Sequence, residues 1–140
     1  MTIQDDNSSS ESFCRDLLNV DKSIRFVGLA NKLGSLVATS YRQNLVPLMT
    51  REETSLYAIQ AVLRATTRED FESKIGRLEY SIGKYQKLIR ATIPILSESG
   101  DKNEAKFYLL LSFDVDSDAK SIIEHKIMDI ISDEKSSITN

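Results

Sequence analysis

Hydrophobic residues recur along this chain with two different periods, and the changes of period mark the expected elements. In the segments 8–20, 50–72 and 117–131, apolar residues return every three or four positions, which is the spacing of one face of a helix. In shorter segments between them, apolar residues alternate with other residues or fill every position, as they do in strands. The pattern predicts the order helix, two strands, helix, three strands and helix.

The stretch from Ile24 to Tyr41 predicts the first two strands, joined by a turn at residues 31–34. Residues 24–30 are apolar on both sides, which is typical of a strand covered on both faces. Residues 35–41 are more polar, so we expect the second strand nearer an edge of the sheet. Gly34 can adopt the positive φ that ends a hairpin loop.

Three further strands are expected after the second helix. Residues 77–83 alternate between apolar and polar positions, which is typical of an edge strand, and a turn is expected at residues 83–84. The next strand is expected at residues 88–95. A polar loop at residues 97–104 then leads to a strand at residues 106–113, whose two apolar faces predict a central position.

Helix starts can be predicted from capping residues. A serine or threonine followed three residues later by a glutamate forms a capping box, and Ser8 and Thr50 are in this position. Asp116 or Ser117 is expected to cap the last helix. One apolar face of each helix is expected to pack inward. These faces consist of Phe13, Cys14, Leu17 and Leu18; of Leu56, Ile59, Val62, Leu63 and Thr66; and of Ala119, Ile122, Ile123, Ile127, Ile130 and Ile131.

Together these elements predict an α+β fold. The first and fifth strands are the most apolar. A five-stranded antiparallel sheet in the order 2-1-5-4-3 puts these two inside and the second and third at the edges, which matches the expected burial, and we predict this order. We expect the long central helix on one face of the sheet and the N- and C-terminal helices on the other. Residues 9–131 are expected to form a single domain, with a disordered tail at residues 1–8 and a frayed tail at residues 132–140.

The order of these elements, together with the turn sequence NKLGSLVA from Asn31 to Ala38, resembles the roadblock / dynein light chain family. The first hairpin of that family commonly carries an acidic or amide residue, a glycine and then a small apolar run. The resemblance covers about residues 24–131 and is carried mostly by the topology. The chain also looks like small proteins of unassigned function from ammonia-oxidising archaea, through the segments Phe26-Val27-Gly28, Pro47-Leu48 and Glu52-Glu53.

The roadblock resemblance implies a module without enzymatic activity. It implies a homodimer that pairs third strands and helices across a two-fold axis, and a platform or regulator for a protein partner such as a small GTPase. Domains with profilin-like or PAS-like sheets bind proteins or small ligands instead. The alternative for this chain is therefore a PAS-like small-molecule sensor, with a pocket between sheet and helix near Tyr57, Phe26 and Tyr108.

Composition and charge narrow the classes of partner. The net charge is −3, and 41% of the 140 residues are hydrophobic and 28% charged, so the chain has no general attraction for nucleic acid or anionic membranes. Cys14 is the only cysteine, and we expect a buried thiol in a reducing compartment. The polar start of the chain and the lack of an apolar run of about 20 residues favour a cytoplasmic protein without membrane insertion.

No motif supports catalysis or metal binding. The segment Asp114 to Asp118 imitates a phosphatase nucleophile strand and a calcium loop, but it lacks the following domain that the first needs and the glycine and glutamate that the second needs. Gly83-Lys84 lacks the spacing of a phosphate loop. His125, the only histidine, is expected on the polar side of the last helix. We therefore expect no catalytic, cofactor-binding or metal-binding residues.

Basic residues gather on the expected third and fourth strands, where Glu79 is the only acid. Basic side chains between tyrosines can bind RNA or an acidic protein surface, but a charged edge that prevents aggregation of sheets is the favoured interpretation, and nucleic-acid binding is not expected. We expect this edge to bind a second copy or another partner. The residues expected there are Arg77, Leu78, Tyr80, Ile82, Lys84, Lys87 and Arg90.

Overall fold

The five strands form one antiparallel sheet in the order β2-β1-β5-β4-β3, which confirms the predicted topology. The computed structural model of the protein describes residues 7–96 and 105–139, with side chains up to residue 133; the expected loop at 97–104 and most of the expected N-terminal tail lie outside them. The strands are β1 (Ile24–Asn31), β2 (Leu36–Tyr41), β3 (Ser81–Lys84), β4 (Leu88–Leu96) and β5 (Ala105–Asp114).

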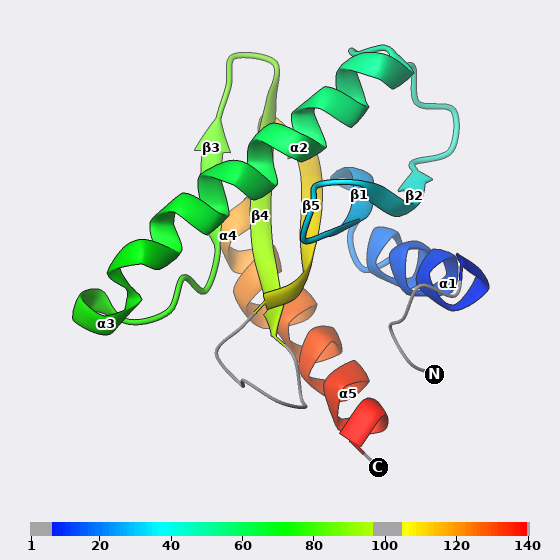
Figure 1. Ribbon diagram of the computed structural model, residues 1–140. Coiled ribbons are helices and arrows are strands. Elements are labelled where there is room, and N and C mark those ends of the chain that lie inside the picture. Colours follow the sequence, from blue (N-terminus) through cyan, green and yellow to red (C-terminus); the bar gives the residue numbers. More distant parts are fainter. Residues whose placement is uncertain (1–6, 97–104, 140) are drawn as a thin grey trace.

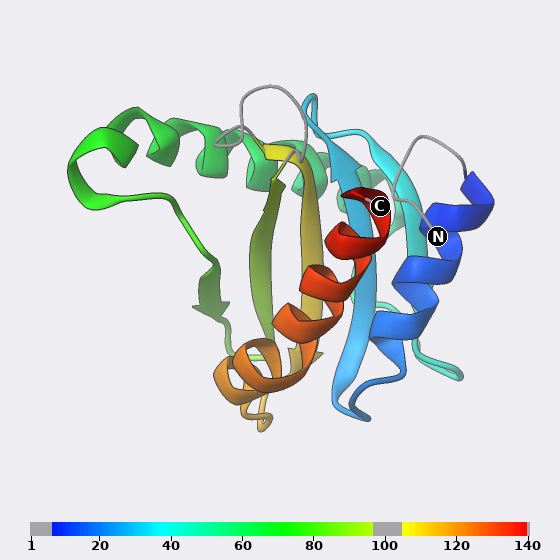
Figure 2. The same cartoon turned by 90° about the horizontal axis from the view of Figure 1, so that it is seen from below.

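Helices cover both faces of the sheet, as predicted (Figures 1 and 2). One face carries the long helix α2 (Arg51–Arg68), which is followed by the 3₁₀ turn η1 (Glu69–Phe71) and the short helix α3 (Glu72–Ile75). The other face carries α1 and the C-terminal helical segment. Their bounds are α1 (Asn7–Leu18), α4 (Ala119–Ile122), the π-helical turn η2 (Ile123–Ile127) and α5 (Met128–Thr139).

Strand β5 is the centre of the hydrophobic core. It pairs with β1 on one side and β4 on the other, and its side chains are buried on both faces. Leu109 and Leu111 pack toward the terminal helices, whereas Tyr108 and Leu110 pack toward α2. The prediction of a central fifth strand is confirmed, because an apolar residue at almost every position can be accommodated only where both faces are covered.

The start of α2 is the predicted capping box. The amide of Glu53 donates to Thr50 Oγ1 at 3.1 Å, and the amide of Thr50 donates to Glu53 Oε1 at 2.8 Å. Two other starts differ from the predictions. The chain is already helical at Asn7, so Ser8 lies inside α1 rather than at its cap.

The last helical segment is capped by Asp118 instead of Asp116 or Ser117. The Asp118 carboxylate accepts a hydrogen bond from the amide of Ser121 at 3.2 Å. Burial of Ala119 fixes the start of α4 at the residue after this cap. At the other end, α5 is helical as far as Thr139. The expected fraying of residues 132–140 stays a prediction.

The third strand is shorter than predicted. Only Ser81–Lys84 pair with β4, so the segment 77–80 is not part of the strand. The turn falls at residues 85–87, where the Tyr85 amide donates to the Leu88 carbonyl at 2.8 Å, and residues 83–84 belong to the strand. The physical reason is that η1 and α3 carry the chain past the sheet edge, and residues 76–80 form its return path (Figures 1 and 2).

Candidate functional site

Helix α2 packs on the sheet with a different face from the one predicted. Its buried residues are Tyr57, Ala58, Ala61, Val62 and Ala65. Of the predicted face, Val62 alone is buried. The alanines let the helix backbone lie close to the sheet, and this close packing leaves the larger side chains on the outside. The predicted residues Leu56, Ile59 and Leu63 are 54%, 50% and 63% exposed.

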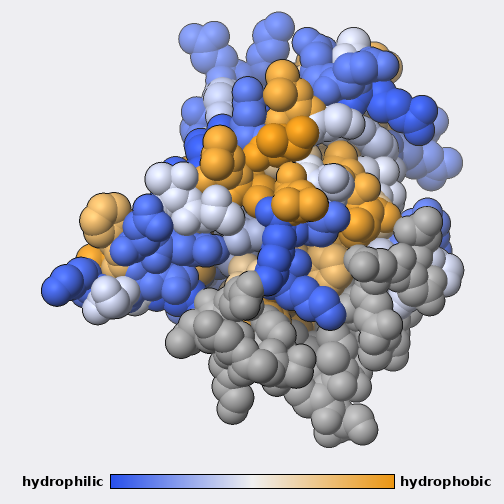
Figure 3. Space-filling view, viewed as in Figure 1, coloured by the Kyte–Doolittle hydropathy of each residue, from blue (hydrophilic) through white to orange (hydrophobic). Residues whose placement is uncertain are grey.

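These outer residues form one apolar surface. Leu56, Ile59 and Leu63 are spaced as one stripe of a helix. Gly34, in the turn after β1, lies against the backbone of Ile59, which places the adjacent Leu33, 82% exposed, next to the stripe. We call Leu33, Leu56, Ile59 and Leu63 the α2 patch. Figure 3 shows apolar side chains gathered across the middle of the face on which α2 lies.

The end of α2, with η1 and α3, projects beyond the edge strand β3 (Figure 2). Between this projection and the returning chain lies an open cleft of about 770 Å³. Phe71 and Ile75 on its wall are 62% and 84% exposed. We call it the overhang cleft. It is lined by Arg68, Phe71, Ile75, Gly76, Arg77, Leu78, Glu79 and Tyr80.

The sequence-predicted edge residues take several different positions. Arg77 is exposed in the overhang cleft, and Leu78 and Tyr80 are half-buried against the two faces of the core. The Tyr80 hydroxyl donates to the carboxylate of Glu124 in η2, which ties the returning chain to the C-terminal helical segment. Leu78 and Tyr80 therefore pack against the core of the monomer. The sequence alone does not show whether they face the core or a dimer interface.

The remaining predicted residues divide between the sheet edge and its face. Ile82 and Lys84 are exposed on β3, which has no strand on its outer side among the described residues. Lys87 is exposed in the turn before β4. Arg90 is half-buried on β4 and turns toward α2, so it does not join the others at the edge.

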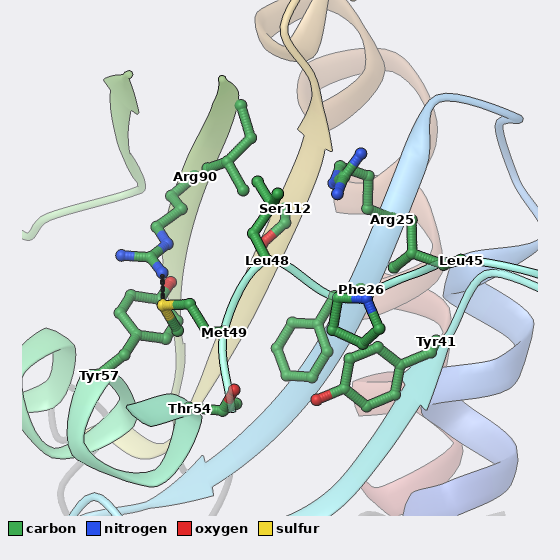
Figure 4. Close-up of a pocket in the computed structure, with 12 residues that line it drawn as sticks. Arg25, Phe26, Tyr41, Leu45, Leu48, Met49, Thr54, Tyr57, Arg90 and Ser112 are labelled. Carbon is green, nitrogen blue, oxygen red and sulfur yellow. Dashed lines mark hydrogen bonds between the residues drawn. The ribbon is translucent and has the colours of Figure 1, made fainter. Parts of the chain in front are cut away.

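Arg90 lies against two aromatic rings. Its guanidinium carbon is 3.8 Å from the ring centroid of Tyr57 and 5.5 Å from that of Tyr85. A terminal nitrogen contacts Met49 Sδ at 2.8 Å (Figure 4). The Tyr57 hydroxyl and Arg90 Nε are buried and have no hydrogen-bond partner in the part of the chain that the structure describes. Burial raises the pKa of Tyr57 to about 12, so its hydroxyl keeps its proton at neutral pH. Sequence spacing gives no signal for this pair, which lies on different elements.

The pocket at Phe26 and Tyr57, between the sheet and residues 45–57, is smaller than a metabolite needs. It has a volume of about 40 Å³, and Phe26 and Tyr57 line it as expected (Figure 4). Sites for drug-sized ligands have volumes of roughly 300–1,000 Å³. Tyr108 does not line it; its hydroxyl donates to Glu69 at 2.7 Å instead, and burial together with this bond raises the pKa of Tyr108.

Asp114, His125 and Cys14, which were considered as reactive residues in the sequence, lie in three different environments. Asp114 accepts hydrogen bonds from Arg42 at 2.8 and 3.0 Å and lies 3.4 Å from Arg25, and these guanidiniums hold the pKa of its carboxyl below the usual value. His125 is exposed on η2. Cys14 is fully buried, which raises the pKa of its thiol to about 12.

The described residues contain neither a cluster of metal-ligating side chains nor a membrane-spanning helix. No three His, Cys, Asp or Glu side chains within residues 8–96 and 105–133 lie together as ligands of a metal ion would. In the same part of the chain, no helix has the length and apolar character required to cross a bilayer.

The fold is similar to that of several solved structures. The roadblock/LC7 domain from Streptomyces avermitilis has a TM-score of 0.66 at 8% identity, over 93% of this chain and 98% of that one. An MglB structure described as having a tetrameric arrangement has a TM-score of 0.70 at 11% identity, over 96% and 93%. The inducer-binding domain of the PobR transcription factor from Acinetobacter, in complex with 3-hydroxybenzoic acid, has a TM-score of 0.55 at 10% identity, over 96% and 97%.

No protein-family model and no curated protein matches the chain. At such low identities the structural similarities establish the fold and leave binding properties open. The strand order, the helices on both faces of the sheet and the similarity to these structures over nearly the whole chain agree with one another. The chain has the α+β fold of roadblock domains.

Proposed function

We propose that the protein is a non-enzymatic interaction and regulatory module that self-associates and binds a protein partner such as a small GTPase. The observation that carries the proposal is the α2 patch. Soluble monomers rarely expose a large contiguous apolar surface unless it binds something. Four aliphatic side chains at 50–82% exposure, held on a helix and an adjoining turn, make a rigid surface of this kind.

Self-association uses a second region, at the edge of the sheet. β3 offers unpaired backbone groups, and the overhang cleft beside it exposes Phe71 and Ile75. Unpaired strand edges bind other strands readily. A second copy that pairs with β3 would fill the cleft and cover both apolar side chains. The related structure described as tetrameric supports self-association, and the roadblock resemblance supports pairing through this edge.

The α2 patch stays separate from that edge, because its residues lie on the outer side of α2 and on the β1–β2 turn. A protein partner can therefore bind the patch while a second copy occupies β3. That the partner is a small GTPase follows from the roadblock resemblance alone. Apolar residues with few charges among them suit the desolvated centre of a protein interface.

Size-exclusion chromatography with light scattering tests self-association. The wild-type chain is expected to be a dimer at micromolar concentration, and Ile75→Asp is expected to shift it toward monomer. Val46→Asp is the matched control, because Val46 is 83% exposed and lies outside the cleft and the patch. A wild-type monomer under these conditions would contradict the self-association.

Partner binding is tested with an affinity pull-down from the native cell extract, followed by binding measurements on the GTPase candidates recovered. Leu63→Asp and Leu56→Asp are expected to abolish binding of a partner that the wild type retains, and Val46→Asp to leave it unchanged. Light scattering on the same variants shows whether they still self-associate. Equal binding by Leu63→Asp and the wild type would exclude the α2 patch.

A sensor function is the second candidate. The PobR similarity favours it, because that domain was solved with 3-hydroxybenzoic acid. The 40 Å³ volume of the pocket at Phe26 and Tyr57 opposes it, since this volume suits roughly one water molecule. Native mass spectrometry after gentle purification distinguishes the two: a bound metabolite would favour the sensor, and a ligand-free chain with no thermal shift across a metabolite panel would exclude it.

A further inference from the structure

A groove separates α2 from the β3–β4 hairpin, on the α2 face of the sheet. Its volume is about 280 Å³, and it is open to solvent. Arg64 and Arg68 reach it from α2, and Arg90 reaches it from β4. No aspartate or glutamate lines it. Three guanidiniums thus face one groove without a carboxylate among them.

The donors of this groove lack adequate acceptors. Within the described residues, none of the three arginines forms an ion pair. The hydrogen-bonding contact of Arg90 is with Met49 Sδ, and a thioether is a weak acceptor. Tyr57 as a residue is 6% exposed, and neither its hydroxyl nor Arg90 Nε has a hydrogen-bond partner among the described residues. Buried donors without acceptors are costly, so the groove is incomplete without a further acceptor.

We propose that this groove binds a phosphate group, in the form of inorganic phosphate or a small phosphorylated molecule. Every polar side chain discussed above can donate a hydrogen bond, which suits a ligand that only accepts them. Three positive charges favour an anion of about two negative charges over a single carboxylate. Guanidinium groups match phosphate oxygens in pairs of parallel hydrogen bonds.

The arginines have different roles in this site. Arg90 is held in place by Tyr57 and Tyr85, so it needs little ordering when a ligand binds. Arg64 and Arg68 are exposed on α2 and can close over the ligand from the rim. The arrangement combines one pre-oriented guanidinium with two adjustable ones.

The site goes beyond the proposed interaction function. Its residues lie on the β3 side of α2 and do not overlap the α2 patch, so a phosphate could bind with or without a partner on the patch. The groove adjoins the β3 edge, and a bound anion would reduce repulsion between the basic groups of two copies there. Association state must therefore be recorded together with affinity.

Isothermal titration calorimetry of the full chain with inorganic phosphate and with pyrophosphate, at constant ionic strength, tests the proposal. The wild type is expected to bind both saturably, and acetate much more weakly. Arg64→Gln and Arg68→Gln are each expected to raise Kd about ten-fold, which corresponds to about 1.4 kcal/mol. Arg51→Gln, at the other end of α2 and outside the groove, is the matched control and is expected to leave Kd unchanged.

Three results would overturn the proposal: no saturable phosphate binding by the wild type, equal losses in Arg64→Gln and Arg51→Gln, or acetate binding as tight as phosphate binding. Because Arg90 is half-buried, Arg90→Gln is assessed only if its thermal unfolding matches that of the wild type; the exposed pair Arg64 and Arg68 decides the outcome in either case. Light scattering at each step separates loss of the ligand site from loss of self-association.

Discussion

Gly34 in the β1–β2 turn lies directly against Ile59 on α2: a Cβ atom built on Gly34 would be 2.7 Å from the Cα atom of Ile59. Gly34 also has a φ of +84°, in the region that side chains disfavour. The contact joins the first hairpin to the long helix and brings Leu33 beside Ile59. The same glycine thus permits the turn and creates the continuity of the α2 patch.

Replacing Gly34 with alanine should destabilise the protein. The backbone φ costs about 1 kcal/mol for a residue with a Cβ, and the clash with a backbone atom that cannot rotate away adds to it, so we expect a loss of about 2–4 kcal/mol in the free energy of unfolding. Urea denaturation measures the loss. Gly83→Ala is the control, because Gly83 has no positive φ and the atom nearest to an added Cβ is 3.5 Å away, in the exposed ring of Tyr85. It should change the free energy of unfolding by less than about 0.5 kcal/mol. Equal losses in the two variants would contradict the strain and the clash at Gly34.

Val62→Ala and Leu63→Ala test which face of α2 is buried. Val62 is 3% exposed and Leu63 is 63% exposed. Removing the buried methyl groups of Val62 should cost about 2 kcal/mol, whereas truncating Leu63 should change the free energy of unfolding by less than about 0.5 kcal/mol. The measurement is urea denaturation at a protein concentration where the association state of both variants is known. A larger loss for Leu63→Ala would restore the face predicted from sequence.

The ion pairs of Asp114 should make stability depend on acid pH. Arg42 and Arg25 hold the pKa of the Asp114 carboxyl below its usual value. This contribution is complete above the unfolded-state pKa of about 3.9 and disappears as the pH falls through the lower folded-state pKa. Because the side chain is 33% exposed, we expect Asp114→Asn to cost only about 1 kcal/mol at pH 7.

Chemical denaturation of Asp114→Asn and the wild type between pH 2 and pH 7 measures this effect. The difference between them should shrink below about pH 4. Asp129→Asn, which changes an exposed carboxylate without an ion pair in the described residues, should show almost no difference at any pH. A difference for Asp114→Asn that stays constant down to pH 2 would mean that the charge of Asp114 is not responsible.

Cys14 should resist thiol reagents in the folded protein. Its side chain is fully buried, and with a pKa of about 12 roughly one thiol in ten thousand is ionised at pH 8. Reaction with a disulfide reagent such as Ellman's should therefore be slow in buffer and rapid in denaturing urea. Fast reaction in buffer at the rate of a free thiol would place Cys14 on the surface.

Long-range topology could be predicted from sequence because burial differs strongly between strands. The apolar residues of β1 and β5 on both faces require central positions, and only an order with these two strands inside satisfies that requirement. The cap at Thr50 was equally predictable, since it depends only on a serine or threonine followed three residues later by a glutamate. Both predictions depend on patterns that lie within single segments of the sequence.

The candidate site was less predictable. The edge strand was predicted at residues 77–83, whereas β3 begins only at Ser81. Arg90, which was expected at the same edge, faces α2 instead. On α2, periodicity allows two faces, one of aliphatic residues and one rich in alanine. The greater hydrophobicity of the aliphatic face favours it as the buried face. Close packing of the helix against the sheet favours the alanine-rich face instead.

By itself, the sequence determined the elements, the sheet order and the absence of a recognisable catalytic motif, because helical and strand periods and central strands are recorded in the pattern of apolar residues. The tertiary structure alone decided what the surface offers. Which stripe of α2 is covered depends on how closely the helix approaches the sheet. The α2 patch, the overhang cleft and the groove lined by Arg64, Arg68 and Arg90 all combine residues from separate elements. Such combinations exist only after the chain has packed, so no local pattern can predict them.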